Sequence, residues 1–114
     1  MDFDLSKKKL TDVNAFLQNI DLKSNQRDFI VKNPSGSHAL CAGLQQEINV
    51  SIKGHVGYYC AGMNKNASIT IDGNVGTGVA ENMMSGIVHV KGNASQSAGA
   101  TGHGGTLIID GDAS

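Results

Sequence analysis

The feature that most constrains this chain of 114 residues is a repeat with a period of 19 residues. Sliding the sequence against itself by 19 positions aligns four glycines, with apolar residues two and four positions before each. The glycine column contains Gly54, Gly73, Gly92 and Gly111. The two apolar columns contain Ile52, Ile71, Val90 and Ile109, and Val50, Ile69, Val88 and Leu107. A repeat of this length indicates a solenoid, in which each unit buries its apolar face against its neighbours.

Each repeat is interpreted as one short strand followed by a corner. The apolar residues alternate with polar ones, as in Val50-Ser51-Ile52, and most are of the β-branched types that strands prefer. No part of the repeat has the length or periodicity of a helix. We therefore predict an all-β fold, a right-handed parallel β-helix with 19-residue coils. The glycine column is predicted to form the structural corners, where the backbone takes a positive φ.

The first 30 residues differ from the rest in composition. Residues 1–30 form a polar segment, within which we predict a short amphipathic helix over residues 11–20. The apolar face of this helix contains Val13, Phe16, Leu17 and Ile20. We expect Thr11 to be its N-cap, and the helix to cover the open first coil of the β-helix.

Residues 31–114 form the predicted β-helix. The repeat is degenerate over 31–49, regular from residue 50 and incomplete in the last coil. In the degenerate coil Val31 aligns with Val50 and Cys41 aligns with Cys60. The two cysteines are therefore expected to stack in adjacent coils as free thiols. A terminal repeat that departs from the pattern is typical of a cap.

The charge balance excludes several classes of partner. Nine basic and ten acidic residues give a net charge of −1, so the chain lacks the excess of basic residues typical of proteins that bind nucleic acid or an anionic membrane.

No apolar run approaches the roughly 18 residues of a membrane span, and the polar start is no signal peptide. Two cysteines are too few for a disulfide framework. We therefore expect a cytoplasmic protein.

We predict no catalytic, cofactor-binding or metal-binding residue in this chain. The four histidines fall at different phases of the repeat, so they cannot all converge on one point with the cysteines. The glycine-rich segments 73–78 and 99–105 are not followed by the helix that a phosphate-binding loop requires, so we interpret their glycines as β-helix corners. No carboxylate pair or nucleophile–base spacing is evident.

One group of residues breaks the small-residue pattern of the coils. We interpret it as a possible partner surface, because methionine and aromatic side chains are common at protein contacts. Ordinary filling of a coil corner is the alternative. The group consists of Tyr58, Tyr59, Met63, Glu81, Asn82, Met83, Met84 and His103.

Three strings of residues carry a resemblance to a known family. They are GHVGYYCAGMN at 54–64, GTGVAENMMSG at 76–86 and ASQSAGATGHGG at 94–105. Together they resemble the GXGXG domain family, which includes the C-terminal β-helix of the glutamate synthase large subunit and a β-helical subunit of formylmethanofuran dehydrogenase. The resemblance is strongest to its stand-alone branch, the glutamate-synthase-like GXGXG subunit of N-methylglutamate synthase (methylamine–glutamate N-methyltransferase).

The resemblance implies a β-helix that supports chemistry carried out by other subunits. We therefore expect a non-catalytic structural subunit of a glutamate-synthase-like complex, acting in methylamine and glutamate metabolism. Amidotransferase-like and FMN-binding synthase-like subunits are the expected partners, with FMN and an iron–sulfur cluster on the partner and no cofactor on this chain. One alternative is a subunit that contributes Glu81, Asn82 or His103 to a shared active site of a glutamate synthase-type oxidoreductase. Another is a subunit of the formylmethanofuran dehydrogenase type.

The last coil predicts a second kind of contact. Members of the family continue for further coils, whereas this sequence stops partway round the fifth. The strand expected at 107–110 would then present unpaired backbone groups and apolar side chains along its edge. Because such edges promote association, we expect an end-on contact through the C-terminal coil, with a second copy or with a larger partner.

Overall fold

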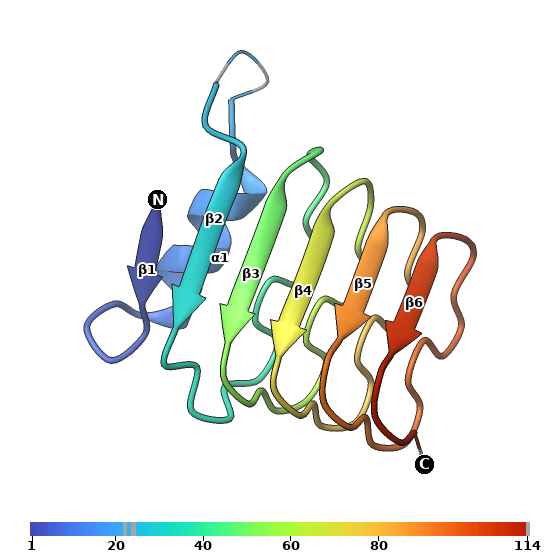
Figure 1. Ribbon diagram of the computed structural model, residues 1–114. Coiled ribbons are helices and arrows are strands. Elements are labelled where there is room, and N and C mark those ends of the chain that lie inside the picture. Colours follow the sequence, from blue (N-terminus) through green and yellow to red (C-terminus); the bar gives the residue numbers. More distant parts are fainter. Residues whose placement is uncertain (22, 24, 114) are drawn as a thin grey trace.

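The computed structural model describes residues 1–21, 23 and 25–113, which contain one helix and six strands (Figure 1). In chain order the elements are β1 (Asp2–Asp4), α1 (Leu10–Gln18), β2 (Asp28–Lys32), β3 (Asn49–Lys53), β4 (Ser68–Asp72), β5 (Ile87–Val90) and β6 (Thr106–Ile109). All neighbouring strands are parallel, and the sheet keeps the order β1 to β6. The strands run down the front of the coil and the chain returns behind them, which is the predicted right-handed β-helix. Within the described part of the chain, no helix has the length and apolar character needed to cross a membrane.

The two apolar columns of the repeat fill the interior of the coil. Val50 pairs with Ile69, and Ile52 pairs with Ile71, so equivalent residues of successive coils lie side by side. These side chains are at most 1% exposed, whereas Ser51 between them is half-exposed. The alternation of apolar and polar residues thus places one face of strands β2 to β5 in the core and turns the other toward solvent.

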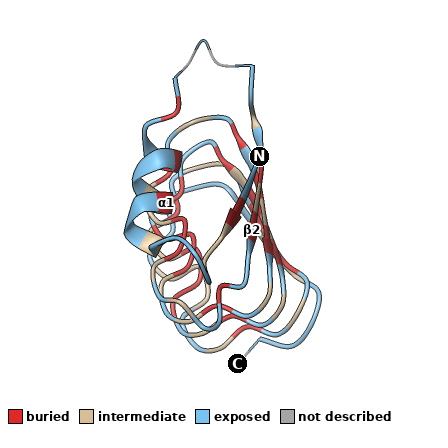
Figure 2. Cartoon of the chain, turned by 90° about the vertical axis from the view of Figure 1, so that its left-hand side faces the viewer, coloured by how far each residue is buried: buried red, intermediate tan, exposed pale blue. Residues whose placement is uncertain are grey.

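β1 and α1 close the N-terminal end of the solenoid (Figure 2). β1 adds a strand beside β2, and Val13 and Leu17 of α1 are buried in the core. Asn14 substitutes for a preceding coil, because its Oδ1 accepts a hydrogen bond from the Cys41 N–H and its Nδ2 donates one to the Ala39 carbonyl, both at 2.8 Å. The predicted helical cap is confirmed.

The helix differs from its prediction at both ends. It begins at Leu10 after Lys9 and ends at Gln18, so Thr11 lies in the first turn and is not the N-cap. The reason is that Lys9 is extended, with φ −74° and ψ 139°, and accepts the first helical hydrogen bonds through its carbonyl. Phe16 is 42% exposed, and its ring contacts the rings of other phenylalanines at the first two strands.

The first coil is longer than the 19-residue repeat, so the predicted alignment of its strand is wrong. Val31 pairs with Ile52 and not with Val50, because Phe29 lies beside Val50. Paired residues of β2 and β3 are 21 positions apart, against 19 for β3 and β4. The backbone hydrogen bonds place one additional residue in the corner after β2 and the other in the segment 45–47.

The same insertion separates the two cysteines along the stack. The Ala61 N–H donates to the Leu40 carbonyl, as the Ala80 N–H donates to the Cys60 carbonyl one coil later. Leu40, and not Cys41, therefore lies beneath Cys60. The prediction that the cysteines share one column is wrong for this reason. Both are buried free thiols.

Close stacking, and not a positive φ, explains most of the repeat glycines. Of the four, Gly54 alone has a left-handed φ, at +136°, so the predicted reason is wrong for Gly73, Gly92 and Gly111. A Cβ on Gly73 would lie 2.4 Å from the carbonyl oxygen of Gly54. Gly92 and Gly111 approach the carbonyl of the preceding coil in the same way. The missing side chain allows successive corners to come together.

The residues after these glycines form a hydrogen-bonded ladder. Nδ1 of His55 accepts a hydrogen bond from the backbone N–H of Asn74 at 2.8 Å. Asn93 donates to Oδ1 of Asn74, and Asp112 donates to Oδ1 of Asn93, both at 2.8 Å. The polar residue after each glycine therefore satisfies a backbone donor of the next coil.

Candidate functional site

The residues of the candidate partner surface lie on the turn segments at the back of the solenoid, and they do not form a single group. Tyr58, at the start of one segment, is 61% exposed and stacks on the ring of His38 with centroids 4.3 Å apart. Met63 and Met84, in the segments of successive coils, are 49% and 50% exposed. Met83 is 3% exposed and belongs to the core, so its place in the predicted surface is wrong. The turn directs the side chain of Met83 into the core, and its place next to Met84 in the sequence did not indicate this.

The remaining members of the surface lie in two columns beside the exposed methionines. The Met63 N–H donates to the carbonyl of Glu81, which places Met63 beneath Asn82. The His103 N–H donates to the carbonyl of Met83, so His103 lies above Met84. Glu81, Asn82 and Tyr59 are half-buried and His103 is exposed. The structure thus stacks Met63 with Asn82 and Met84 with His103, and leaves Tyr58 with His38.

The backbone under this surface alternates between right- and left-handed conformations. Tyr59, Ala61 and Met63 have φ of +58°, +57° and +53°, and the same alternation recurs in the coils before and after. It points successive N–H groups alternately up and down the stack: Tyr59 donates to the next coil and Ala61 to the preceding one. Positive φ in residues other than glycine often marks a strained functional site. Because every coil repeats it, this strain belongs to the fold.

The thiols are not placed to act as nucleophiles. Burial raises the pKa of Cys41 to about 12 and raises the pKa of Cys60 well above its usual value. Because the thiolate is the reactive and metal-binding form, both cysteines are inert in the folded protein.

The histidines serve separate contacts and do not converge. Nδ1 of His38 accepts a hydrogen bond from the Tyr58 N–H at 2.8 Å, in the same manner as His55 in the ladder. His89 lies on the outer face of the sheet, with Nε2 2.9 Å from Oδ2 of Asp110. Across the described residues, no group of three or more histidine, cysteine, aspartate or glutamate side chains is arranged to hold a metal ion.

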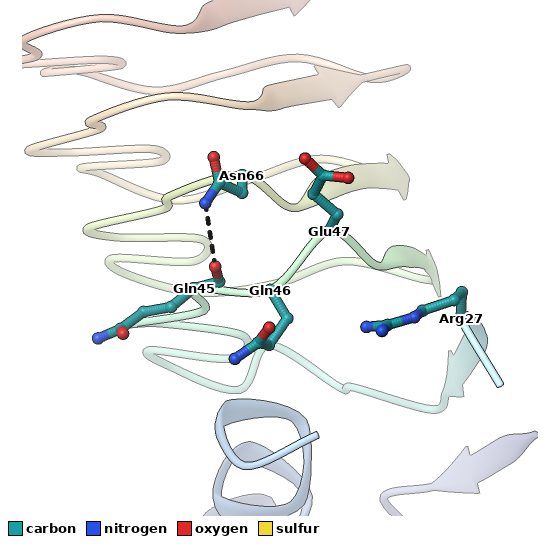
Figure 3. Close-up of a pocket in the computed structure, with 5 residues that line it drawn as sticks. All are labelled: Arg27, Gln45, Gln46, Glu47 and Asn66. Atoms are coloured by element: carbon teal, nitrogen blue, oxygen red, sulfur yellow. Dashed lines mark hydrogen bonds between the residues drawn. The ribbon is translucent and has the colours of Figure 1, made fainter. Parts of the chain in front are cut away.

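A polar hollow of about 420 Å³ lies where the repeat is interrupted, and the sequence did not predict it (Figure 3). We call it the Arg27 hollow; its lining residues are Arg27, Gln45, Gln46, Glu47 and Asn66. Nδ2 of Asn66 donates to the carbonyl of Gln45 at 3.2 Å and closes one side. Two signals in the sequence could have indicated it: Arg27 is the only arginine of the chain, and the first coil is longer than the period.

Comparisons with known proteins give one partial relative. The chain is 50% identical over 56 residues to Protein GlxC of Rhizobium meliloti (strain 1021), a match that covers 49% of this chain and 25% of that protein. No protein-family model matches the chain, and no solved structure matches it significantly. The match therefore spans about a quarter of the length of the relative.

Proposed function

We propose that this chain is a non-catalytic structural subunit of an enzyme complex. The observation that carries the proposal is that both thiols and two of the four histidines serve the packing and hydrogen bonding of the stacked coils. Both thiols are in the core, and His38 and His55 accept hydrogen bonds from the backbone of the next coil. Side chains used in this way are unavailable for acid–base or nucleophilic work.

The complex we propose is glutamate-synthase-like, and most specifically N-methylglutamate synthase. The partial match to GlxC supports a glutamate-synthase-like role, and the three strings that resemble the GXGXG domain support the finer assignment. The proposed partners are an amidotransferase-like subunit and an FMN-binding synthase-like subunit. FMN and the iron–sulfur cluster are assigned to the partner, and no residue of this chain is proposed to bind them.

We propose two contact regions on this chain. The first is the exposed part of the candidate partner surface, around Met63 and Met84. The second is the edge of β6, which pairs with β5 on one side, and beside which a hollow of about 240 Å³ is lined by Met83, Leu107 and four glycines. Leu107 and Ile109 are half-buried, whereas the equivalent residues of β5 are fully buried. Unpaired edges with apolar side chains favour association.

Sedimentation of the 114-residue polypeptide tests the contact at β6. We expect a species larger than 11.9 kDa, together with slow amide exchange in residues 107–110. A stable monomer of 11.9 kDa with fast exchange in β6 would contradict this contact and leave the first region unaffected.

An alternative is that the chain lends residues to a shared active site. The observation that favours it is His103, which is exposed and whose ring makes no hydrogen bond among the described residues, with Glu81 and Asn82 in the coil below. Glu81→Ala and His103→Ala in the assembled complex separate the two functions. The structural function predicts turnover that falls only as far as assembly weakens. Loss of turnover in a fully assembled complex would establish the alternative.

The neighbouring genes distinguish both of these functions from a third, that of a subunit of the formylmethanofuran dehydrogenase type. This third function requires genes for molybdenum or tungsten subunits beside the gene of this chain.

A further inference from the structure

Two histidine rings hold the backbone of the following coil. The Tyr58 N–H donates to Nδ1 of His38, and the Asn74 N–H donates to Nδ1 of His55, both at 2.8 Å. Because the backbone group is the donor in each bond, Nδ1 must carry the lone pair. Each ring is therefore neutral and has its proton on Nε2. We call these two bonds the histidine joints.

The rest of the polar ladder uses an acceptor that does not titrate. At the position of His55 the next two coils have Asn74 and Asn93, whose Oδ1 atoms accept backbone hydrogen bonds of the same 2.8 Å length. An amide oxygen stays an acceptor across the neutral and mildly acidic range, whereas an imidazole takes up a second proton there. The ladder therefore has one proton-sensitive bond followed by two insensitive ones.

The ring of His38 is packed closely into its joint. The Tyr58 ring stacks on it, with centroids 4.3 Å apart and planes inclined by 14°. On Gly57, the residue before Tyr58, a Cβ would collide with Nδ1 of His38, so the missing side chain lets the ring approach the backbone. The titratable group in contact with this ring is a phenol, which ordinarily keeps its proton far above the range in which imidazole titrates.

The charges at the corner of His55 are paired with each other. Lys53 and Asp72 precede His55 and Asn74 by two residues, and their side chains lie 3.9 Å apart. Within the described part of the chain, neither histidine of the joints forms an ion pair. The hydrogen bond from the next coil is therefore the polar contact that changes when either ring takes up a proton.

His89 responds to protons in the opposite sense. Its Nε2 lies 2.9 Å from Oδ2 of Asp110, across β5 and β6, so protonation turns this contact into an ion pair. Acid therefore strengthens a contact between the last two strands, while it removes the acceptors of the earlier coils. A measurement on single bonds is needed to separate the two effects.

We propose that His38 and His55 make the stacking of the coils sensitive to protons between about pH 7.5 and 5.5. A proton from solvent adds to Nδ1, so a donor then faces the donor of the next coil and the hydrogen bond is lost. The stabilisation from each joint is present above this range and lost below it. Because Tyr58 belongs to the candidate partner surface, the joint of His38 also connects that surface to the pH of the solution. The proposal concerns this chain itself and does not depend on the complex to which it belongs.

Amide exchange with solvent, measured by NMR on the ¹⁵N-labelled 114-residue chain, tests each bond separately. The protection factor compares the rate expected for an unfolded chain with the measured rate, which removes the intrinsic effect of pH on exchange. We expect the protection of the Tyr58 and Asn74 amides to fall at least about fivefold from pH 7.5 to 5.5. The amides of Asn93 and Asp112, which donate to asparagine oxygens, are internal controls and should keep their protection.

Two variants identify the group that titrates. His55→Asn installs the residue that the ladder has at 74 and 93, so it keeps an acceptor and removes the titration. In this variant the Asn74 amide should stay protected at both pH values, while Tyr58 should still respond through His38. His103→Asn, at an exposed position, is the matched control, and both amides should respond as in the wild type.

Several outcomes overturn the proposal. Unchanged protection of Asn74 between the two pH values would show that protonation does not break the joint. An equal loss at Asn93 would show general loosening, and a persistent loss at Asn74 in His55→Asn would show that another group titrates. If His55→Asn does not fold, as judged by its melting temperature, the wild-type comparison of Asn74 with Asn93 decides. Imidazole ¹⁵N signals give a further check, since a proton on Nδ1 of His55 at pH 7.5 would contradict the joint.

Discussion

Replacing Gly73 with alanine tests the central structural claim, that the repeat glycines exist to let coils approach. A Cβ on Gly73 would lie 2.4 Å from the Gly54 carbonyl oxygen and 2.5 Å from its carbon, where ordinary contact begins at 3.4 Å. The oxygen is therefore 1.0 Å too close, and both atoms are backbone. No flexible side chain can move aside, so the two coils must separate.

The cost of this separation follows from the bonds that flank the contact. The Gly54 N–H donates to the Asp72 carbonyl at 3.2 Å, and the Val56 N–H donates to the Asn74 carbonyl at 3.0 Å. Overpacking of this kind costs about 1–3 kcal/mol, and the weakening of the two hydrogen bonds adds about 1 kcal/mol in total. We expect Gly73→Ala to lower the free energy of unfolding by about 2–4 kcal/mol. For a chain of this size the melting temperature should fall by about 8–16 °C.

Two other glycines supply the controls. Gly111→Ala meets the same obstacle, with the Gly92 carbonyl oxygen at 2.6 Å, but its corner follows the edge strand β6 and can move outward. We expect it to cost under about 1 kcal/mol. Gly36→Ala isolates the effect of a positive φ, since φ is +75° and nothing lies within 4 Å of the new Cβ, and should cost about 1 kcal/mol. Calorimetry and denaturant unfolding measure all three. A Gly73→Ala variant as stable as the wild type, or a Gly111→Ala variant equally destabilised, would refute the reasoning.

Three further predictions concern the cap, the acid range and the thiols. Asn14→Ala should lower the free energy of unfolding by about 1–3 kcal/mol, measured by urea denaturation, because it leaves the buried Cys41 N–H without an acceptor. Hydrogen bonds from Asn33 and Ser6 lower the pKa of Asp4 to about 2, below its usual 3.8. The stability that Asp4 contributes should therefore be present above pH 4 and lost as the pH falls toward 2, and Asp4→Asn should flatten that part of the stability–pH curve. Neither thiol should react with a thiol-specific disulfide reagent in the native protein, and both should react on unfolding; fast native labelling would contradict their burial.

The regular coils could be predicted from the sequence because each 19-residue repeat contains the same alternation of apolar and polar residues. Val50 and Ile52 alternate with polar residues, and the same pattern at 19-residue spacing fixes strand, inward face and register together. The role of Gly73 could not be predicted in the same way. A glycine before a polar residue is compatible with a positive φ and with close backbone contact, and only the distance to the preceding coil separates the two.

Prediction failed at the first coil, where one sequence pattern had two possible alignments. Val31 resembles Val50 at the 19-residue period, but Phe29 and Val31 alternate as well as Val50 and Ile52 do. Burial of Phe29 decides the register, since its ring is 2% exposed and packs against other aromatic rings of the cap. β1 escaped prediction because three residues are too few to show a periodicity.

The Arg27 hollow shows why a repeat predicts the regular coils more readily than the places where they differ. A period emphasises what every coil shares, and in this chain the shared residues pack the core, form the polar ladder and close the corners. A binding site needs residues that differ from coil to coil, and those residues do not align. The single arginine and the surplus residue at 45–47 are visible in the sequence, but 16 residues separate Arg27 from Leu44, and no rule of spacing connects them. The hydrogen bond from the Asn49 N–H to the Arg27 carbonyl makes the connection, because it lays the start of β2 against the end of the first coil. For a solenoid, the residues that interrupt the period are therefore where a search for function should begin.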